Sequence, residues 1–116
     1  MRRKRGVLLP IELSILDAAL ELRLRAHEEF YGFLIARHIA ETRESRLLTA
    51  HGTLYRALER MAGSGLLASH WEDPGVAALE KRPRRRFYKV TAAGESAAKR
   101  RYLELPAVLR EGRAQL

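Results

Sequence analysis

The stretch from Gly52 to Leu67, GTLYRALERMAGSGLL, constrains the fold of this chain more than any other part of the sequence. Because each residue turns a helix by about 100°, Leu54, Leu58 and Met61 share one apolar face. Two glycines near the end of the stretch supply the stop signal of a helix C-terminus. An apolar Leu-Leu pair then begins a strand. We therefore expect a helix over residues 50–62 that leads directly into a β-hairpin.

Two strands of that hairpin can be placed. Residues 66–72 alternate between apolar and polar side chains, as a strand with one buried face does. Asp-Pro-Gly at 73–75 turns the chain, and a loop leads to a second strand over residues 84–91. In the second strand we expect Tyr88 and Val90 to face the core, with the residues around them on the opposite side.

Three further segments have the apolar spacing of helices. Leucines recur three and four residues apart over 9–24, where Pro10 suits the first turn. A second stripe runs over 30–44, and Thr91 is a candidate cap for a last helix over 92–104. The predicted order is therefore helix, helix, helix, strand, strand, helix. This is the order of a winged helix-turn-helix, a mostly α fold of the α+β class with a β-hairpin wing.

The length of 116 residues suits one domain, in which we distinguish three parts. Residues 1–7 are a basic N-terminal arm, residues 8–91 the winged helix-turn-helix domain, and residues 92–116 a C-terminal dimerisation helix with a tail. The apolar face of the helix over 9–24 is broader than a monomer of this size needs. We therefore expect a homodimer, in which this face also covers a partner subunit.

Positive charge is concentrated in two short segments. Lys and Arg total 22 against 14 acids, which gives a net charge of +8. Ten of the basic residues lie in segments 2–5 and 81–89, and neither segment contains an acid. The rest of the chain is nearly neutral. A localised excess of this kind indicates a polyanionic partner, with double-stranded DNA first and an anionic membrane second.

The third helix and the hairpin carry the residues expected to bind DNA. In a helix-turn-helix, the second helix of the motif enters the major groove. Arginines there match guanine edges or phosphates, while hydroxyl groups and the N–H groups at the helix start reach phosphates. Cations of the wing would meet the DNA backbone or the minor groove. The predicted DNA-binding residues are Thr49, Gly52, Thr53, Tyr55, Arg56 and Arg60, followed by Lys81, Arg82, Arg84 and Arg85.

The sequence gives little support to other chemistry. It has no cysteine, and its four histidines have no metal-ligand spacing. No serine stands in a nucleophile motif and no glycine-rich phosphate loop is present, so we expect no enzyme, no cofactor and no metal. Glu12 and Asp17 interrupt the apolar N-terminal stretch, and no apolar run reaches the ~18 residues of a spanning helix. We expect a cytoplasmic protein that does not bind membranes.

Three aromatic residues outside this set have expected positions of their own. His51 starts the third helix, either as a solvated side chain or as a pH-sensitive phosphate contact. His38 lies on the apolar stripe of the second helix and is expected in the core or an interface. Trp71, the only tryptophan, is expected to pack against the body of the domain, with ligand stacking as the alternative.

Several motifs together resemble the PadR family of bacterial winged-helix transcriptional regulators. They are GTLYRALERMAGSGLL, SHWE and RPRRRFYKVTAAG, and the resemblance extends over residues 8–104. YGFLIARHIAE is similar to the family's second helix. The chain departs from the family at Ala50-His51, where Ser-Pro is common, and at Ala92, where Pro is common. Its short C-terminal part resembles the short-tailed branch of the family.

The resemblance implies a homodimer that binds an inverted repeat in promoter DNA, usually as a repressor. It places Thr53, Tyr55 and Arg56 on the recognition helix and residues 82–85 on the wing. It also implies that the first and last helices form the dimer, and that in many members a small hydrophobic effector releases the DNA. Two other functions stay open: a winged-helix protein–protein interaction module with an acidic partner, and a non-specific nucleic-acid-binding protein.

Overall fold

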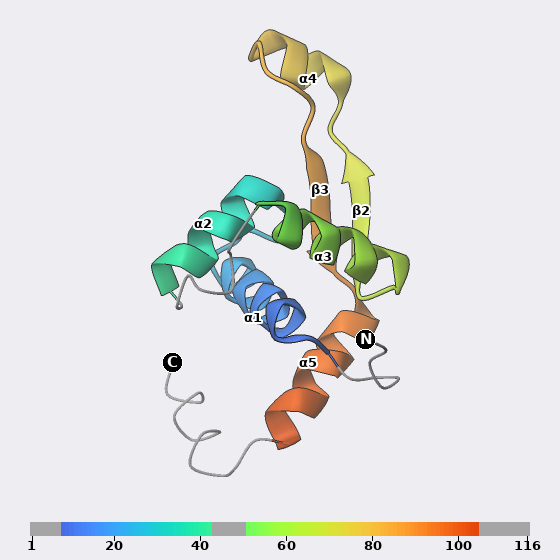
Figure 1. Ribbon diagram of the computed structural model, residues 1–116. Helices are drawn as coiled ribbons and strands as arrows, with labels where there is room; N and C mark the ends of the chain where they lie inside the picture. The colour runs from blue at the N-terminus through green and yellow to red at the C-terminus, as the bar shows by residue number, and fades with distance from the viewer. Residues whose placement is uncertain (1–7, 43–50, 105–116) are drawn as a thin grey trace.

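The structure, a computed structural model, describes residues 8–42 and 51–104. Its elements in chain order are α1 (Pro10–Leu24), β1 (Phe30–Tyr31), α2 (Gly32–Thr42), α3 (His51–Gly63), β2 (Leu67–Trp71), α4 (Pro74–Leu79), β3 (Arg86–Val90) and α5 (Ala92–Glu104). The first three long helices form the body, a hairpin projects from it, and α5 lies at the end opposite the hairpin (Figure 1). The predicted winged helix-turn-helix is confirmed.

The core lies where the apolar faces of α1, α2 and α3 meet the inner face of the sheet. Leu54, Leu58 and Met61, which we predicted for one face of the third helix, are all buried, so the helical phase is confirmed. The fully buried large apolar side chains are Ile15, Leu16, Phe30, Ile35, Ile39, Leu54, Leu58 and Met61. One continuous cluster therefore holds the three helices together.

The sheet has three antiparallel strands in the order β1-β3-β2, which is one strand more than the predicted hairpin. Phe30 and Tyr31 of β1 pair with Tyr88 and Phe87 of β3. A two-residue strand is too short to show alternation, so the sequence wrongly predicts the start of a helix there. Tyr88 is buried as predicted, and its ring stacks on that of Phe30 with centroids 5.9 Å apart.

A short helix, α4, forms the tip of the wing, where the sequence predicts a turn and a loop (Figure 1). Pro74 occupies its first turn, and Oδ1 of Asp73 accepts a hydrogen bond from the Gly75 N–H at 2.7 Å. The prediction is wrong here because residues that cap a short helix also form β-turns. Ala77 of α4 is buried, whereas Leu79 is 86% exposed.

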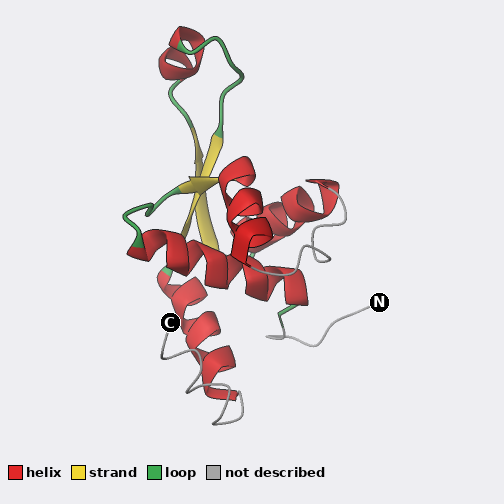
Figure 2. Ribbon diagram, turned by 90° about the vertical axis from the view of Figure 1, so that its left-hand side faces the viewer, coloured by secondary structure: helices red, strands yellow, loops and turns green. Residues whose placement is uncertain are grey.

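α5 begins where we predicted, because Thr91 caps it. Oγ1 of Thr91 accepts the Gly94 N–H at 3.1 Å and donates to the Gly65 carbonyl oxygen at 2.6 Å. The helix contacts α1 and runs away from the sheet (Figure 2). Among the described residues, every helix is too short or too polar to span a bilayer. The predicted arm at 1–7, Thr49 and the tail after Glu104 lie outside the described residues.

Candidate nucleic-acid interface

The outer face of α3 presents most of the residues predicted for it. Arg56 and Gly52 are exposed, Thr53 is partly exposed, and Tyr55 is 43% exposed. The Arg56 guanidinium lies beside Gly52, since a Cβ added at Gly52 would be 3.4 Å from Nη1 of Arg56. These side chains point outward because the apolar residues of α3 occupy its inner face. Thr49 is not among the described residues, so its predicted role stays a prediction.

Arg60, which we predicted for the same outer face, lies instead against α1. Its Nε donates to Oε2 of Glu12 at 2.9 Å, and Oε1 of Glu12 accepts the Leu9 N–H at 2.8 Å. Glu12 is fully buried, whereas the Arg60 side chain is 39% exposed. The helical period separates Arg56 from Arg60 by only about 40°, so the sequence cannot distinguish them. The neighbouring helix gives Arg60 a carboxylate partner, while its side chain stays partly exposed.

Glu72, directly after β2, accepts hydrogen bonds from three arginines on the other side of the wing. Nη1 and Nη2 of Arg82 donate to its carboxylate at 2.6 and 2.8 Å, and Nη2 also donates to Glu80 at 2.6 Å. The Arg85 N–H donates to the same carboxylate at 3.2 Å, and Nε of Arg84 donates to the Glu72 carbonyl oxygen at 2.9 Å. Charge-assisted pairs of this kind are among the stronger hydrogen bonds of proteins.

The hydrogen bonds to Glu72 and Glu80 compensate the charge of Arg82 and bury most of its side chain. The hydrogen bonds from Arg82 lower the pKa of Glu72 to about 2, and those from Glu72 and Glu80 raise the pKa of Arg82. Both groups are therefore ionised at neutral pH and compensate each other. The Arg82 side chain is only 19% exposed, so its main contacts lie within the wing. We predicted that it contacts DNA from near the tip of the wing, a role that its burial against these two carboxylates does not favour.

Aromatic rings support the three arginines that follow. Cζ of Arg84 lies 5.6 Å and Cζ of Arg86 5.2 Å from the Trp71 ring centroid, and Cζ of Arg85 lies 4.1 Å from that of Tyr31. Such cation–π contacts contribute about 0.5–1 kcal/mol each at exposed sites. Trp71 is 53% exposed, so the prediction that it packs against the body is wrong. β2 has already left the body at Trp71 and brings its ring to the wing arginines.

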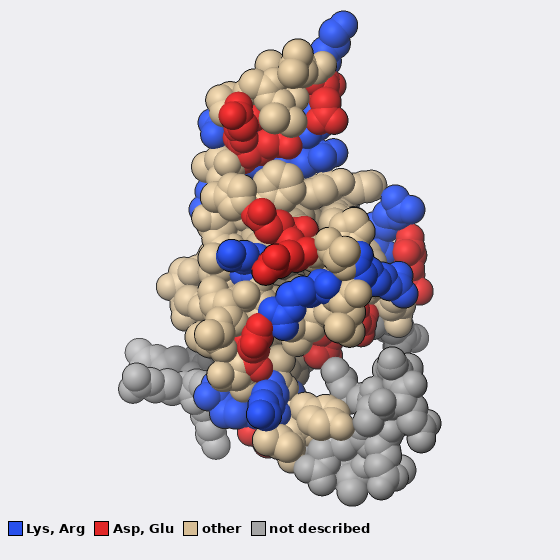
Figure 3. All heavy atoms as spheres, turned by 180° about the vertical axis from the view of Figure 1, so that it is seen from behind, with Lys and Arg blue, Asp and Glu red and all other residues tan. Residues whose placement is uncertain are grey.

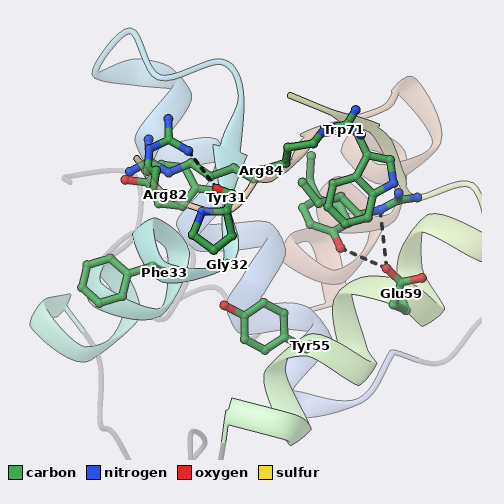
Figure 4. Close-up of a pocket in the computed structure, with 12 residues that line it drawn as sticks. Tyr31, Gly32, Phe33, Tyr55, Glu59, Trp71, Arg82 and Arg84 are labelled. Atoms are coloured by element: carbon green, nitrogen blue, oxygen red, sulfur yellow. Dashed lines mark hydrogen bonds and ion pairs between the residues drawn. The ribbon is translucent and has the colours of Figure 1, made fainter. Parts of the chain in front are cut away.

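The wing, α3 and the start of α2 surround a hollow of about 670 Å³ (Figure 4). Tyr55 comes from α3, Gly32 from α2 and Trp71 from β2. A Cβ at Gly32 would lie 2.4 Å from Cε1 of Tyr55, so only glycine lets the Tyr55 ring lie there. Aromatic and arginine side chains of this kind are enriched in binding surfaces. The lining residues are Tyr31, Gly32, Phe33, Tyr55, Glu59, Trp71, Arg82, Pro83, Arg84, Arg85, Arg86 and Tyr88.

Acidic residues reduce the net charge of the wing. Six cations at 81–89 led to the prediction of a strongly basic hairpin, but Glu72, Asp73 and Glu80 belong to the same hairpin. Figure 3 shows acidic and basic side chains interleaved on the face it presents. Lys81 and Arg84 remain exposed, whereas Arg85 is half-buried. The cations of the wing are therefore placed individually rather than as one uniform patch.

Three residues that hold the arginines of this interface could not be identified as such from the sequence. Glu12 is a single carboxylate within an apolar helical stripe, and this pattern could have suggested a buried ion pair. Glu72 follows a strand without any motif of its own. Tyr31 lies in β1, a strand of two residues that is too short to be predicted from alternation. Each acts through a partner distant in the sequence, which local spacing does not reveal.

Nothing in the described part of the chain resembles a metal site, since no cluster of three potential ligands occurs there. His38 is buried, as predicted, and its Nε2 lies 2.9 Å from Oε1 of Glu21. His70 contacts Glu29, and this hydrogen bond raises the His70 pKa. His38 and His70 thus have carboxylate neighbours that account for their positions.

Comparison with known proteins agrees with this architecture. A search of the curated proteins gives no match. Among solved structures, the chain is similar to a PadR family transcription regulator from hypervirulent Clostridium difficile R20291, with 24% identity and a TM-score of 0.63 over 81% of this chain and 84% of the other. A transcriptional regulator from Clostridium thermocellum has 21% identity and a TM-score of 0.62, over 84% of this chain and 87% of its own.

A third similar structure is a PadR family transcriptional regulator from Eggerthella lenta DSM 2243. It has 23% identity and a TM-score of 0.58, and the match covers 87% of this chain and 78% of the other. At this level of identity, the three likenesses establish the fold. The family model described as the transcriptional regulator PadR-like family matches residues 22–100, well over half of the chain. The chain therefore belongs to the PadR-like family of transcriptional regulators.

Proposed function

We propose that this protein is a sequence-specific DNA-binding repressor that acts as a homodimer on an inverted-repeat operator. One observation supports the proposal most: Tyr55 of α3 lines the same hollow as Arg84 and Arg85 of the wing. A helix that reads the major groove and a wing that follows the backbone must address one face of the DNA together. The shared hollow of Tyr55 and these two arginines supports such an arrangement.

In this proposal the wing supplies affinity and α3 supplies the choice of sequence. Cations that displace counterions from phosphates strengthen binding to any DNA and make it sensitive to salt. Arg84 and Arg85 rest on aromatic rings before DNA arrives, so less side-chain freedom is lost on binding. Arg56 and Thr53 then contact base edges or the neighbouring phosphates.

We further propose that the dimer and an effector regulate this activity. Two copies related by a two-fold axis place their recognition helices about 34 Å apart on one side of the duplex. Leu24 at the end of α1 is 89% exposed and Leu103 near the end of α5 is 56% exposed, which supports a partner surface there. A small hydrophobic effector would then release the DNA, and the protein would act in the cytoplasm, where its DNA is.

Fluorescence anisotropy with two labelled duplexes tests the proposed function. One duplex is the DNA upstream of the protein's own gene and the other a scrambled control, each titrated at low and near-physiological salt. We expect a preference of a hundredfold or more for the first duplex that survives added salt. Equal binding that collapses with salt would contradict a specific regulator of this gene. A selection from a random library would then distinguish a charge-driven binder from a wrong choice of promoter.

A further inference from the structure

Two consecutive residues of α3, Glu59 and Arg60, hold the helix from two sides. Arg60 binds Glu12 of α1, with Nε and Oε2 2.9 Å apart. Glu59 accepts a hydrogen bond from the Tyr88 hydroxyl at 3.2 Å and lies 3.5 Å from Nε of Arg86, both on β3 (Figure 4). We propose that Glu59 and Arg60 form a clamp that positions the recognition helix, and that Arg60 is a positioning residue rather than a DNA contact. The inference rests on the proposed function.

The buried carboxylate of Glu12 allows the α1 side of the clamp to hold α3 in only one position. An ionised carboxylate without exposure to water needs a charged partner and hydrogen bonds, which Arg60 and the Leu9 N–H provide. Ala57 and Met61, on adjacent turns of α3, are fully buried in the same core. If α3 moved by one turn or rotated on its axis, the charge would face apolar side chains. The pair therefore favours one register and one rotation of α3.

This rotation determines where the DNA-reading side chains point. Arg56 stands one turn before Arg60 on the same helix, so any rotation that separates Arg60 from Glu12 swings Arg56 by the same angle. Recognition side chains must be held within about 10–20° of their productive geometry. A loose clamp would thus weaken discrimination between sequences. It would leave the number of phosphate contacts, and hence the salt dependence of binding, unchanged.

Anisotropy titrations on Glu12→Gln, Arg60→Gln and the double variant test the clamp. The probes are a duplex selected by the wild type from a random library and a scrambled duplex, at several salt concentrations. Each single variant is expected to reduce the preference for the selected duplex at least tenfold with an unchanged salt slope. The double variant should be no worse than the worse single variant, because both changes break one interaction. A salt slope lowered by about one in Arg60→Gln, with Glu12→Gln like wild type, would overturn the proposal.

Glu59→Ala is an independent test, because it leaves the buried Glu12 in place and the clamp and its absence predict opposite effects. Alanine is a good helix former, so α3 should still form. The clamp predicts a lower preference for the selected duplex. Without a clamp, removing an acidic charge beside the wing would strengthen binding to both duplexes. Unchanged or tighter binding with full preference would therefore overturn the proposal.

Hydrogen exchange on the free protein separates failure of the clamp from failure of the proposed function. The amides of residues 57–62 are expected to exchange faster in Arg60→Gln and Glu59→Ala than in wild type, whereas those of α2 should not change. Equal protection of α3 in all variants would refute the clamp even if DNA binding changed. A wild type that prefers no duplex in the library would refute the proposed function, while the exchange rates still decide whether the clamp exists.

Discussion

Arg56 and Arg60 stand on neighbouring turns of α3 and carry the same side chain, yet their surroundings assign them different roles. Arg56 is exposed beside Gly52, whereas Arg60 pairs with a buried carboxylate. We expect Arg56→Ala to weaken binding to the operator by about 1–3 kcal/mol and to blur its specificity, because a base contact is lost. Anisotropy with operator and scrambled duplexes measures both effects. Equal weakening on the two duplexes would mean that Arg56 contacts only a phosphate.

Arg84 and Arg85 are expected to act through charge alone. The double variant Arg84→Ala plus Arg85→Ala should weaken operator and scrambled DNA alike and flatten the salt slope by up to about two units. Titrations over a range of salt concentrations give this slope. Lys99→Ala plus Arg100→Ala is the matched control, since it removes two exposed cations from α5, at the end opposite the wing (Figure 1). If the slope stays at the wild-type value in the wing variant, the wing does not bind phosphates.

Glu72 is expected to make the stability of the protein depend on acid pH. Hydrogen bonds from Arg82 lower its pKa from 4.5 to about 2 in the folded state. Because this carboxyl pKa is lower in the folded state, the ionised group stabilises the fold at any pH above its ordinary pKa of 4.5. This contribution is lost as the pH falls from 4.5 toward 2. Because glutamine does not titrate, the difference in unfolding free energy between wild type and Glu72→Gln should be largest above about pH 5 and shrink below it.

Denaturant unfolding followed by circular dichroism from pH 7 to pH 3 measures that difference. Glu28→Gln, which changes an exposed carboxylate on the surface, provides the control. A difference between wild type and Glu72→Gln that is independent of pH would contradict the role given to the Arg82 pair. Such a result would leave only the shape of the Glu72 side chain to explain any loss of stability.

At the scale of elements, the sequence predicts the long helices well and the short elements poorly. The phase of α3, the start of α5 at its Thr91 cap and the burial of Tyr88 all follow from local periodicity and capping. β1 and α4 were missed because two and six residues are too few to establish a period. The predicted positions of Arg56 on the exposed face of α3 and of Arg84 on the wing also agree with the structure, whereas their contact with DNA stays a prediction. The roles of Arg60 and Arg82 were not predictable, because Arg60 pairs with a carboxylate of a distant helix and Arg82 with carboxylates that the fold of the wing brings to it.

The junction between the sheet and α5 depends on a glycine. A Cβ at Gly94 would lie 2.3 Å from the Leu66 carbonyl oxygen and 2.8 Å from Cγ1 of Val90, so Gly94→Ala must push α5 away from the sheet. We expect it to lower the unfolding free energy by about 1–3 kcal/mol, as overpacking does. Gly63→Ala is the control, since a Cβ there meets nothing within 4 Å. Chemical denaturation of both variants measures the effect, and equal stabilities would mean that the junction adapts.

At the scale of the whole molecule, the mass of the particle in solution bears most directly on the proposed operator. A monomer has one recognition helix and can read one half-site, whereas an inverted repeat requires two copies. Leu24 and Leu103 are exposed apolar side chains at the ends of α1 and α5, where we propose the partner surface. We therefore expect the wild type to sediment at micromolar concentration with twice its monomer mass of 13.2 kDa.

Leu103→Asp should shift that particle to the monomer mass, because a carboxylate within an apolar interface loses its hydration. Leu79→Asp on α4 is the matched control: Leu79 is 86% exposed at the tip of the wing, and the change should leave sedimentation as in wild type. The Leu103→Asp monomer should also lose most of its operator affinity but keep the salt-dependent binding to scrambled DNA, since its wing is intact. A wild type that sediments only at 13.2 kDa would contradict the inverted repeat and leave a protein that reads a single half-site.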